Sequence, residues 1–421
     1  MDGPLHVTGP FMSKLLQINP VLRVSTSTGR IMQEIGELAL QHGWESYIAY
    51  SRGRDGIKPC RSQLLPVGNL WSVACHGFAT RLSDRHGLSS DRATRQLIGQ
   101  IEQLRPDIIH LHNLHGYFLN YRILFRYLSR CGIPVVWTVH DCWLYTGHCF
   151  YYSFARCDRW QHGCGHCPQR REFPASLFRD RSARNYADKR RAFTSMPYDR
   201  LTFVPVSEWI RGEMSRSFLS SYDFRVIHNG IDTEVFRPSA PSEVLDKYPL
   251  RGKRILLGVA SVWSREKGLD DFIALSRLLS VDERLVLVGI KPADRKRLPP
   301  HVIAISRTEN IQELAALYAA ADVFVNPTWQ DNYPTVNLES IACGTPVVTY
   351  RTGGSVEAVT PATGLVVEQG DVAGLLAAAR TAIRRGKPFY AKTCRDYALA
   401  HFRKEDRYME YLQLYDKLTG R

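Results

Sequence analysis

The chain has 421 residues and a formal net charge of +14, with 44% hydrophobic and 23% charged residues. These values are globular, so they exclude wholesale disorder, and the length predicts two or three domains. No apolar run approaches the ~18 residues that span a bilayer, and residues 1–11 lack the pattern of a secretory signal. We therefore expect a cytoplasmic protein, with Met12 as a second candidate start.

Short apolar strands alternate with helical patterns in the first half of the chain. We predict strands at 15–18, 46–50, 108–112, 135–139 and 203–206, and helices at 31–42, 93–104 and 121–131. Strands that are apolar throughout and alternate with helices indicate a parallel sheet covered on both faces.

The same α/β pattern returns in the second half. We predict strands at 255–260, 285–289, 302–305, 323–327, 346–350 and 365–367, and helices at 269–279, 311–319, 336–342 and 372–383. Two tandem Rossmann-like domains, 1–230 and 231–400, should therefore meet at an interdomain cleft that binds a ligand. A hinge is expected over 229–245, and the end of the chain, 401–421, should form a helix that packs back on the first domain.

The most informative segment follows the strand predicted at 323–327 and reads DNYPTVNLESIACGTPVV over 331–348. A helix beginning near Thr335 would offer free backbone N–H groups and a positive dipole end to a phosphate. Asp331 before it and Glu339 within it could reach a sugar and a ribose diol. Their spacing alone fits a capping Asp and a solvent-facing Glu as well, but the whole string is more specific.

This string resembles the nucleotide-sugar site of the retaining family 4 glycosyltransferases, which have the GT-B fold. They carry two acidic residues separated by seven others, followed by a small-Cys-Gly-x-Pro-Val stretch. The resemblance implies that Asp331, where the family usually has Glu, contacts the donor sugar and that Glu339 contacts the ribose. The variant Asp-Asn-Tyr-Pro is similar to the subset that builds bacterial exopolysaccharides such as colanic acid.

A second motif, WSREKGL over 263–269, follows the strand predicted at 255–260. The resemblance implies that Lys267 neutralises the donor diphosphate, which suits a point charge. A cation at a helix start opposes the helix dipole, and this mismatch itself favours a functional role. Val262 replaces the Arg that the family usually has, and Arg265 is its candidate substitute.

Smaller motifs complete the donor site that the resemblance implies. A polar loop at 25–30 can cradle phosphate, the segment 307–309 lies where the family holds the base, and a Gly-Gly turn at 353–357 allows close backbone approach to a ligand. The further donor-binding residues are Gly29, Arg30, Glu309, Asn332, Thr335 and Val336.

The strand predicted at 135–139 ends in His140, which its position directs toward the cleft. A lone His is more often structural, but the resemblance implies that His140 contacts the donor sugar near the reacting centre. His110, His112 and His115 form a second cluster. We predict a polar cluster near the acceptor pocket there, rather than a metal site.

Four cysteines fall in a Cys-rich insertion predicted at 142–170: Cys149, Cys157, Cys164 and Cys167. Cys164 and Cys167 form a C-x2-C pair, a usual geometry for tetrahedral zinc. We predict a structural zinc site, with buried free thiols or a labile disulfide as alternatives. His148, His162 and His166 are replacement ligands.

We therefore predict a retaining glycosyltransferase that moves a sugar from a nucleotide-diphosphate sugar to a lipid-linked or oligosaccharide acceptor in bacterial surface polysaccharide synthesis. No Asp-x-Asp motif is placed to hold a divalent ion, so no cofactor is expected for catalysis. The basic stretch at 170–200 is either a solvated surface or a patch facing an anionic membrane at the cytoplasmic face of the inner membrane. Nucleic acid is not an expected partner, because no binding motif accompanies the charge. The alternatives are a GT-B sugar-nucleotide epimerase and a non-catalytic zinc-braced scaffold.

Overall fold

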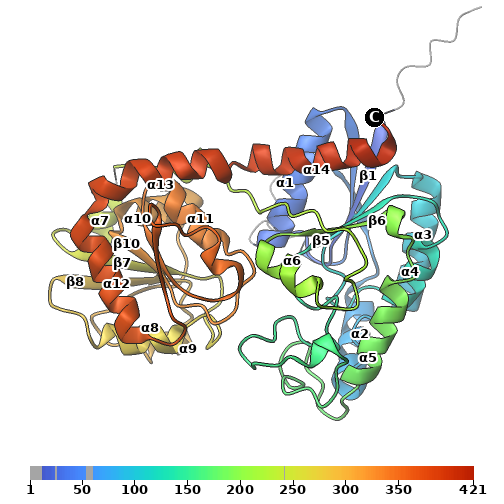
Figure 1. Cartoon of the computed structure of the whole chain (residues 1–421), viewed down its shortest axis with the longest axis horizontal. Coiled ribbons are helices and arrows are strands. Elements are labelled where there is room, and N and C mark those ends of the chain that lie inside the picture. Colours follow the sequence, from blue (N-terminus) through green and yellow to red (C-terminus); the bar gives the residue numbers. More distant parts are fainter. Residues whose placement is uncertain (1–11, 24–25, 54–59, 241) are drawn as a thin grey trace, which may run out of the picture.

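The computed structural model describes residues 12–23, 26–53, 60–240 and 242–421. Two α/β lobes lie next to each other, each with a six-stranded parallel sheet (Figure 1). The strands of the first lobe are β1 (Ser13–Ile18), β2 (Trp44–Tyr50), β3 (Gln63–Pro66), β4 (Ile108–Leu111), β5 (Val135–Val139) and β6 (Leu201–Pro205), in the order β3-β2-β1-β4-β5-β6.

Helices cover both faces of this sheet, because its strands are apolar on both sides. They are α1 (Ser27–Gln41), α2 (Leu70–Ser83), α3 (Asp91–Leu104), α4 (Tyr121–Leu128), α5 (Ser182–Phe193) and α6 (Glu208–Met214). A long connection from β5 to α5 contains a single described helical turn, Arg159–Gln161.

The second lobe repeats the architecture. Its strands are β7 (Arg254–Val259), β8 (Glu283–Val288), β9 (Ile303–Ile305), β10 (Val323–Asn326), β11 (Val347–Tyr350) and β12 (Gly364–Val367), in the order β12-β11-β10-β7-β8-β9. Its helices are α7 (Ser242–Lys247), α8 (Leu269–Ser276), α9 (Pro292–Arg295), α10 (Ile311–Ala320), α11 (Thr335–Ala342), α12 (Val372–Arg385) and α13 (Lys387–His401).

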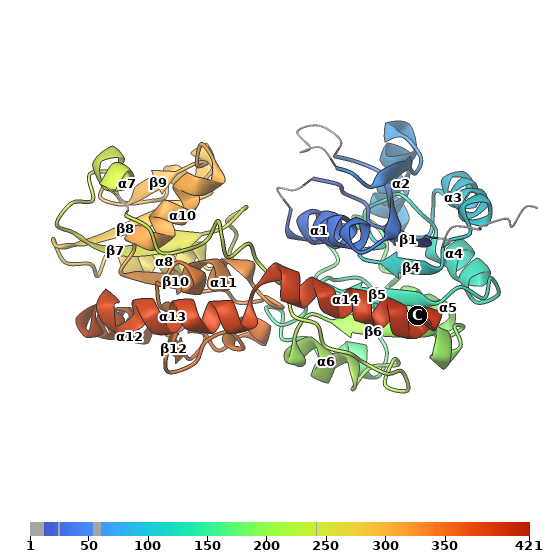
Figure 2. The same ribbon diagram turned by 90° about the horizontal axis from the view of Figure 1, so that it is seen from above.

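The chain crosses between the lobes twice, and the two crossings lie together. The backbone N–H of Ile231 donates to the Phe402 carbonyl at 2.8 Å, and the N–H of Lys404 donates to the Ile231 carbonyl at 3.0 Å. Beyond this point α14 (Lys404–Thr419) lies along α1 of the first lobe (Figure 2). Its buried face, which includes Tyr411 and Tyr415, completes a core of the first lobe.

The α/β, two-sheet GT-B architecture is as predicted, and every predicted strand overlaps an observed one. The edge strand β3 and the helices α2, α5, α7, α9 and α13 were not predicted. The first eleven residues and Ser25 of the predicted phosphate loop lie outside the described residues. Among the described helices, none is both long enough and apolar enough to cross a bilayer.

Candidate active site

Each sheet has one place where consecutive crossovers run in opposite directions. In the first sheet β1 lies between β2 and β4, and in the second β7 lies between β8 and β10. Loops at the carboxyl ends of strands diverge at such points and leave room for a ligand. The loops that follow β5, β7 and β10 carry His140, Lys267 and Asp331.

Lys267 and Asp331 meet at the switch point of the second sheet. The Lys267 ammonium donates to Asp331 Oδ2 at 2.5 Å. Gly268 has a φ of +77° and starts α8, and a side chain there would clash with the Pro327 carbonyl. The glycine therefore lets the lysine loop lie against the end of β10.

The helix α11 begins at Thr335, as predicted, next to this pair. Its N-cap residue is Pro334, and no side chain of the described residues caps the helix. Thr335 and Val336 are half-buried. The first turn thus keeps backbone donors and a positive dipole end for an anion beside Lys267.

Glu339 lies further along α11 and is 4% exposed. It accepts hydrogen bonds from the Tyr318 hydroxyl at 3.2 Å and from the Arg30 guanidinium at 3.4 Å. Burial raises the pKa of Glu339, against the opposing effect of Arg30. Since Arg30 belongs to α1, this contact brings predicted donor residues from both lobes together.

Gly29 precedes Arg30 in the first turn of α1. Its N–H donates to the capping Thr26 hydroxyl at 3.3 Å, and a side chain at Gly29 would clash with the Arg23 carbonyl. Gly29 therefore shapes the turn that presents Arg30, and its own N–H is already used by the cap.

His140 is half-buried at the end of β5, and one ring nitrogen contacts His112 at 3.1 Å. His112 in turn contacts Gln17 at 3.1 Å. Burial lowers the pKa of His140 to about 4, although the neighbouring Asp141 carboxylate favours the charged ring. The imidazole is therefore neutral at physiological pH and can exchange hydrogen bonds with a sugar hydroxyl.

Asn332 links the two halves of the site. Its amide donates to the Val139 carbonyl at 3.3 Å and to the His140 carbonyl at 3.1 Å, and it accepts a hydrogen bond from Ser207. The side chain is 2% exposed. This predicted donor residue thus uses its amide to fix the loop after β10 against the loop after β5.

The Gly-Gly turn at 353–354 supports the same loop. Side chains at these glycines would clash with the carbonyls of Asp331 and Asn332. The predicted close approach does occur, but the partner is this protein backbone. Glu357, three residues on, accepts from the first N–H groups of α6, Glu208 at 2.9 Å and Trp209 at 2.7 Å. Sequence reasoning missed this interdomain cap, since its partner is 148 residues away.

Two predicted donor residues direct their side chains elsewhere. Arg265 is 75% exposed, pairs with Asp270 at 3.6 Å and lies 5.7 Å from the Phe154 ring. Glu309 is 74% exposed and accepts from Lys247 at 2.6 Å. Neither contacts the Lys267–Asp331 pair in the described structure.

The second histidine cluster has two parts. His110 is fully buried between Thr138, at 2.7 Å, and Tyr415 of α14, at 2.6 Å, so it belongs to the core and not to the predicted acceptor pocket. His115 pairs with Asp141 at 2.7 Å, beside the loop that carries His140.

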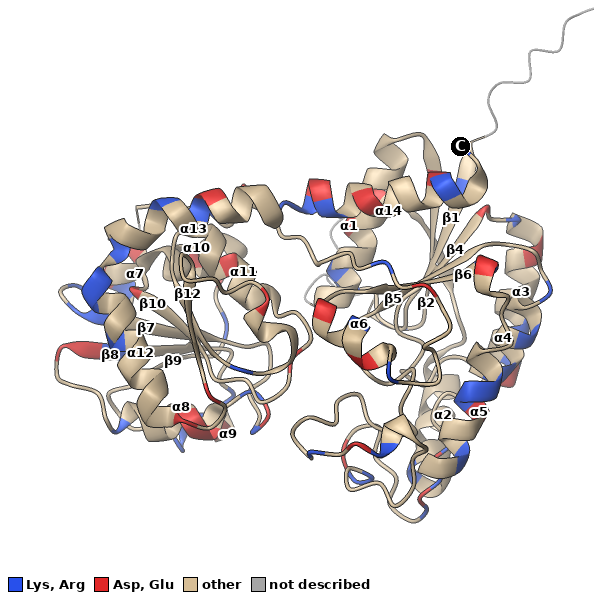
Figure 3. Ribbon diagram, viewed as in Figure 1, with Lys and Arg blue, Asp and Glu red and all other residues tan. Residues whose placement is uncertain are grey.

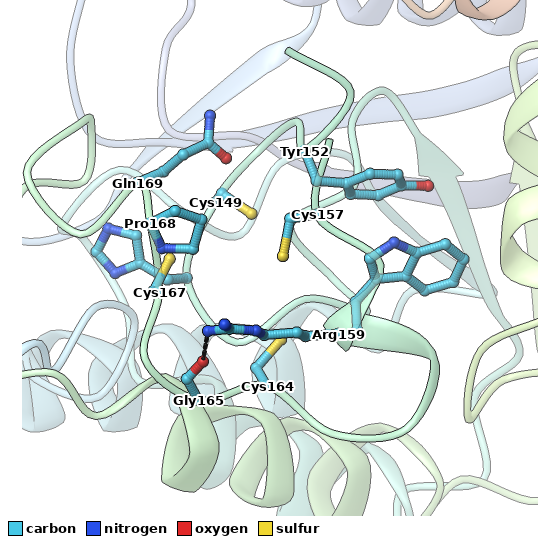
Figure 4. A pocket seen from close by; sticks show the side chains of 11 residues that line it. Cys149, Tyr152, Cys157, Arg159, Cys164, Gly165, Cys167, Pro168 and Gln169 are labelled. Carbon is cyan, nitrogen blue, oxygen red and sulfur yellow. Dashed lines mark hydrogen bonds between the residues drawn. The ribbon is translucent and has the colours of Figure 1, made fainter. Parts of the chain in front are cut away.

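The four predicted zinc ligands line one small cavity in the connection from β5 to α5 (Figure 4). All four are free thiols in the structure. This connection also touches the site, because the Tyr151 hydroxyl donates to the His140 carbonyl at 3.4 Å and the Phe154 N–H donates to Gln330 at 3.3 Å.

Two family models match the chain. The model described as Glycosyltransferase Family 4 matches residues 29–235, and the model described as Glycosyl transferases group 1 matches residues 253–385. Both models describe glycosyltransferases, and together they cover most of both lobes, so the chain is a glycosyltransferase.

Two relatives with named activities are similar to this chain. The chain is 24% identical over 415 residues to WcaC of Escherichia coli K12, which is named as a colanic acid biosynthesis glycosyl transferase, and the match covers 93% of this chain and 95% of WcaC. It is 29% identical over 272 residues to a GDP-mannose-dependent phosphatidylinositol dimannoside mannosyltransferase of Mycobacterium tuberculosis. That match covers 63% of this chain and 62% of the relative.

Solved structures show the same fold. Sucrose-phosphate synthase of Thermosynechococcus elongatus superposes with a TM-score of 0.72 at 18% identity, covering 97% of this chain and 99% of the other. HepE of Anabaena, in complex with UDP, gives 0.68 at 12% identity, covering 96% and 100%. The molecule is a glycosyltransferase of the GT-B type with relatives in bacterial polysaccharide synthesis.

Proposed function

We propose that this glycosyltransferase moves a sugar from a nucleotide-diphosphate sugar to a lipid-linked glycan acceptor, with retention of anomeric configuration. The observation that carries the proposal is the Lys267–Asp331 pair at the switch point of the second sheet, beside the uncapped start of α11. A cation, a carboxylate and free backbone donors in one place suit a diphosphate joined to a sugar.

The roles follow from the charge that develops in the reaction. When the glycosidic bond to the diphosphate breaks, negative charge grows on the leaving oxygen, and Lys267 and the first turn of α11 stabilise it. Asp331 accepts hydrogen bonds from the sugar, and Glu339 takes the ribose hydroxyls in exchange for Arg30. His140, from the first lobe, contacts the sugar as a neutral ring. Arg265 can turn toward the diphosphate, because it is exposed.

Retention follows from attack on the face that the diphosphate leaves. In this scheme a donor phosphate oxygen takes the acceptor proton, so no enzyme nucleophile is required. The pairing of Asp331 with Lys267 supports the scheme, since a carboxylate held by an ammonium is a weak nucleophile.

Similar proteins support the donor class. The mycobacterial relative is named for GDP-mannose, and HepE has been solved with UDP and with UDP-glucose. These names differ in base and sugar, so they support a nucleotide-diphosphate sugar as a class.

An exposed apolar surface supports a membrane-bound acceptor. On α2, Trp71 is 77% exposed and Phe78 64% exposed, and their spacing of seven places them on one face with Leu82. The loop 173–178, which belongs to the connection from β5 to α5, adds Phe173 and Phe178. This loop contacts α2, because the Leu177 N–H donates to the Arg81 carbonyl at 2.8 Å.

Basic residues surround this apolar surface, which comprises α2 and the loop 173–178. Arg81 lies on α2, Arg170 donates to the Phe178 carbonyl at 3.2 Å, and further Lys and Arg follow along α5 (Figure 3). Aromatic side chains beside arginines suit the interface of an anionic leaflet. We therefore place the enzyme on the cytoplasmic face of the inner membrane, where it would meet a lipid-linked acceptor.

Calorimetric titration of the purified chain with a panel of UDP-, GDP- and ADP-sugars tests the proposal. We expect one donor to bind, and NMR of the product to show the donor's anomeric configuration. A scaffold would bind no nucleotide sugar, and an epimerase would convert the donor without acceptor. Either result, or a product of inverted configuration, would overturn the proposal.

A further inference from the structure

The connection between β5 and α5 encloses a cavity of about 10 Å³, which is the space of roughly one water molecule. Cys149, Cys157, Cys164 and Cys167 line it, and their sulfurs face a common space (Figure 4). The surrounding chain has little regular structure and few long apolar segments. Four convergent thiols are an unusual content for so small a cavity.

A histidine lines the same cavity and has one nitrogen free. His148 Nδ1 contacts Asp84 Oδ1 at 2.7 Å, and both side chains are buried. Within the part of the chain that the structure describes, His148 Nε2 has no hydrogen-bond partner. Asp84 is itself held, since it accepts from the Arg181 N–H at 2.9 Å. A carboxylate that orients an imidazole with a free second nitrogen is the arrangement found next to metal ions.

One backbone donor and two cations also lie in or near this cavity. The Gly147 N–H donates to Cys164 Sγ at 3.1 Å, a bond that stabilises a thiolate. Arg159 lines the cavity and donates to the Gly165 carbonyl, at 2.7 Å, within the C-x2-C loop. Lys189 is buried and donates to the carbonyls of Trp143 and Thr146. In the described residues no carboxylate pairs with it, so an anionic thiolate centre would balance its charge.

We infer that this cavity binds one Zn²⁺ through the thiolates of Cys149, Cys157, Cys164 and Cys167. His148 lines the same cavity and is a nitrogen donor outside this four-thiolate set. Tetrahedral thiolate coordination is the usual closed structural zinc site, and binding releases the thiol protons. Among the described residues no three His, Cys, Asp or Glu side chains already form a group that could hold a metal. The four side chains must therefore close in on the ion.

The ion would organise the loops beside His140 and Gln330 without touching substrate. The connection that it braces supplies Tyr151, which contacts the His140 carbonyl, and Phe154, which contacts Gln330 of the second lobe. Metal loading would therefore affect activity through the position of these loops.

The test uses the full chain, purified without a metal-affinity tag from medium supplemented with zinc, and measures metal by mass spectrometry. We expect about one zinc per chain, and at least a tenfold lower content in Cys164→Ser and Cys167→Ser. Cys75→Ser and Cys131→Ser, which lie outside the cavity, are the matched controls and should keep the metal. Chelation should lower the melting temperature of the wild type and of these controls.

Cobalt in place of zinc identifies the ligands. If the cobalt-loaded His148→Gln variant shows the same thiolate-to-cobalt charge-transfer absorption as the wild type, the result supports the four-thiolate set. Loss of metal in that variant, with metal retained in Cys149→Ser or Cys157→Ser, would overturn that set. Wild-type protein with less than about a tenth of a zinc per chain, or with Cys149 and Cys167 joined in a disulfide, would overturn the site itself.

Discussion

Lys267 is a cation at the start of a helix, where the dipole disfavours it. Its contact with Asp331 offsets this cost while no donor is bound. The diphosphate of a donor would replace the carboxylate as the partner of the ammonium, and the charge on that partner grows as the bond to the sugar breaks. Lys267 is therefore expected to affect kcat more than the affinity for the donor.

We expect Lys267→Ala to lower kcat by about 10²–10³, the usual loss when one group that stabilises developing charge is removed. Binding of the bare nucleoside should change little, because the nucleoside has no phosphate. Steady-state kinetics and calorimetry measure the two effects. Lys296→Ala, on the exposed surface after α9, is the control. Wild-type turnover in Lys267→Ala would remove the residue from the reaction.

Glu339 is buried, and Arg30 and Tyr318 already hydrogen-bond to it. We expect Glu339→Gln to raise the Kd for the donor by about 10- to 100-fold, since one charge-assisted hydrogen bond contributes about 1.5–3 kcal/mol. Titration calorimetry measures this, and Glu368→Gln, on the exposed surface, is the control. An unchanged Kd in a folded variant would exclude the ribose contact.

At the scale of elements, the sequence predicts the strands well because their apolar runs are short, continuous and separated by helical patterns. It misses α2 because the usual pattern of a surface helix is reversed there: Trp71, Phe78 and Leu82 are exposed, whereas the buried residues are His76 and Thr80. It misses β3 because four residues at a sheet edge carry almost no pattern. The loop motifs predict Asp331, Lys267 and Glu339 as site residues, but the contacts made by Asn332 and Glu357 depend on partners from the other lobe.

The exposed face of α2 gives a prediction at this scale. We expect the double variant Trp71→Ser/Phe78→Ser to bind vesicles containing phosphatidylglycerol at least about tenfold more weakly than the wild type, because two interfacial aromatic anchors are lost. Vesicle flotation measures the difference, and Val281→Ser, exposed on the second lobe, is the control. Equal flotation of the double variant and the wild type would argue against membrane binding through this surface.

At the scale of the whole molecule, the first lobe keeps several histidines neutral in its interior. Burial lowers the pKa of His76 and of His140 to about 4, and it lowers the pKa values of His86, His110 and His112 as well. The unfolded chain protonates these rings below about pH 6.5 while the folded chain does not. Their contribution to stability is therefore present above about pH 6.5 and is lost as the pH falls toward 4.

His110 isolates this effect. His110→Asn should be less stable than the wild type at pH 7.5, because Thr138 and Tyr415 lose a buried partner. The difference in the free energy of unfolding should shrink as the pH falls to 5, since only the wild type has this ring to protonate. Urea denaturation across this range measures it. A difference that stays constant would mean that His110 is not kept neutral by the fold.

The packing of α14 against α1 also bears on the order in which the chain can fold during synthesis. The last strand of the first lobe ends near residue 205, but Tyr411 and Tyr415, which complete its interior, are made some 200 residues later. At about 5–20 residues per second, the ribosome needs roughly 10–40 s to reach them. Throughout that time the nascent first lobe presents an uncovered apolar face, and His110 lacks its Tyr415 partner. The first half of this protein therefore matures only after the second half has been translated.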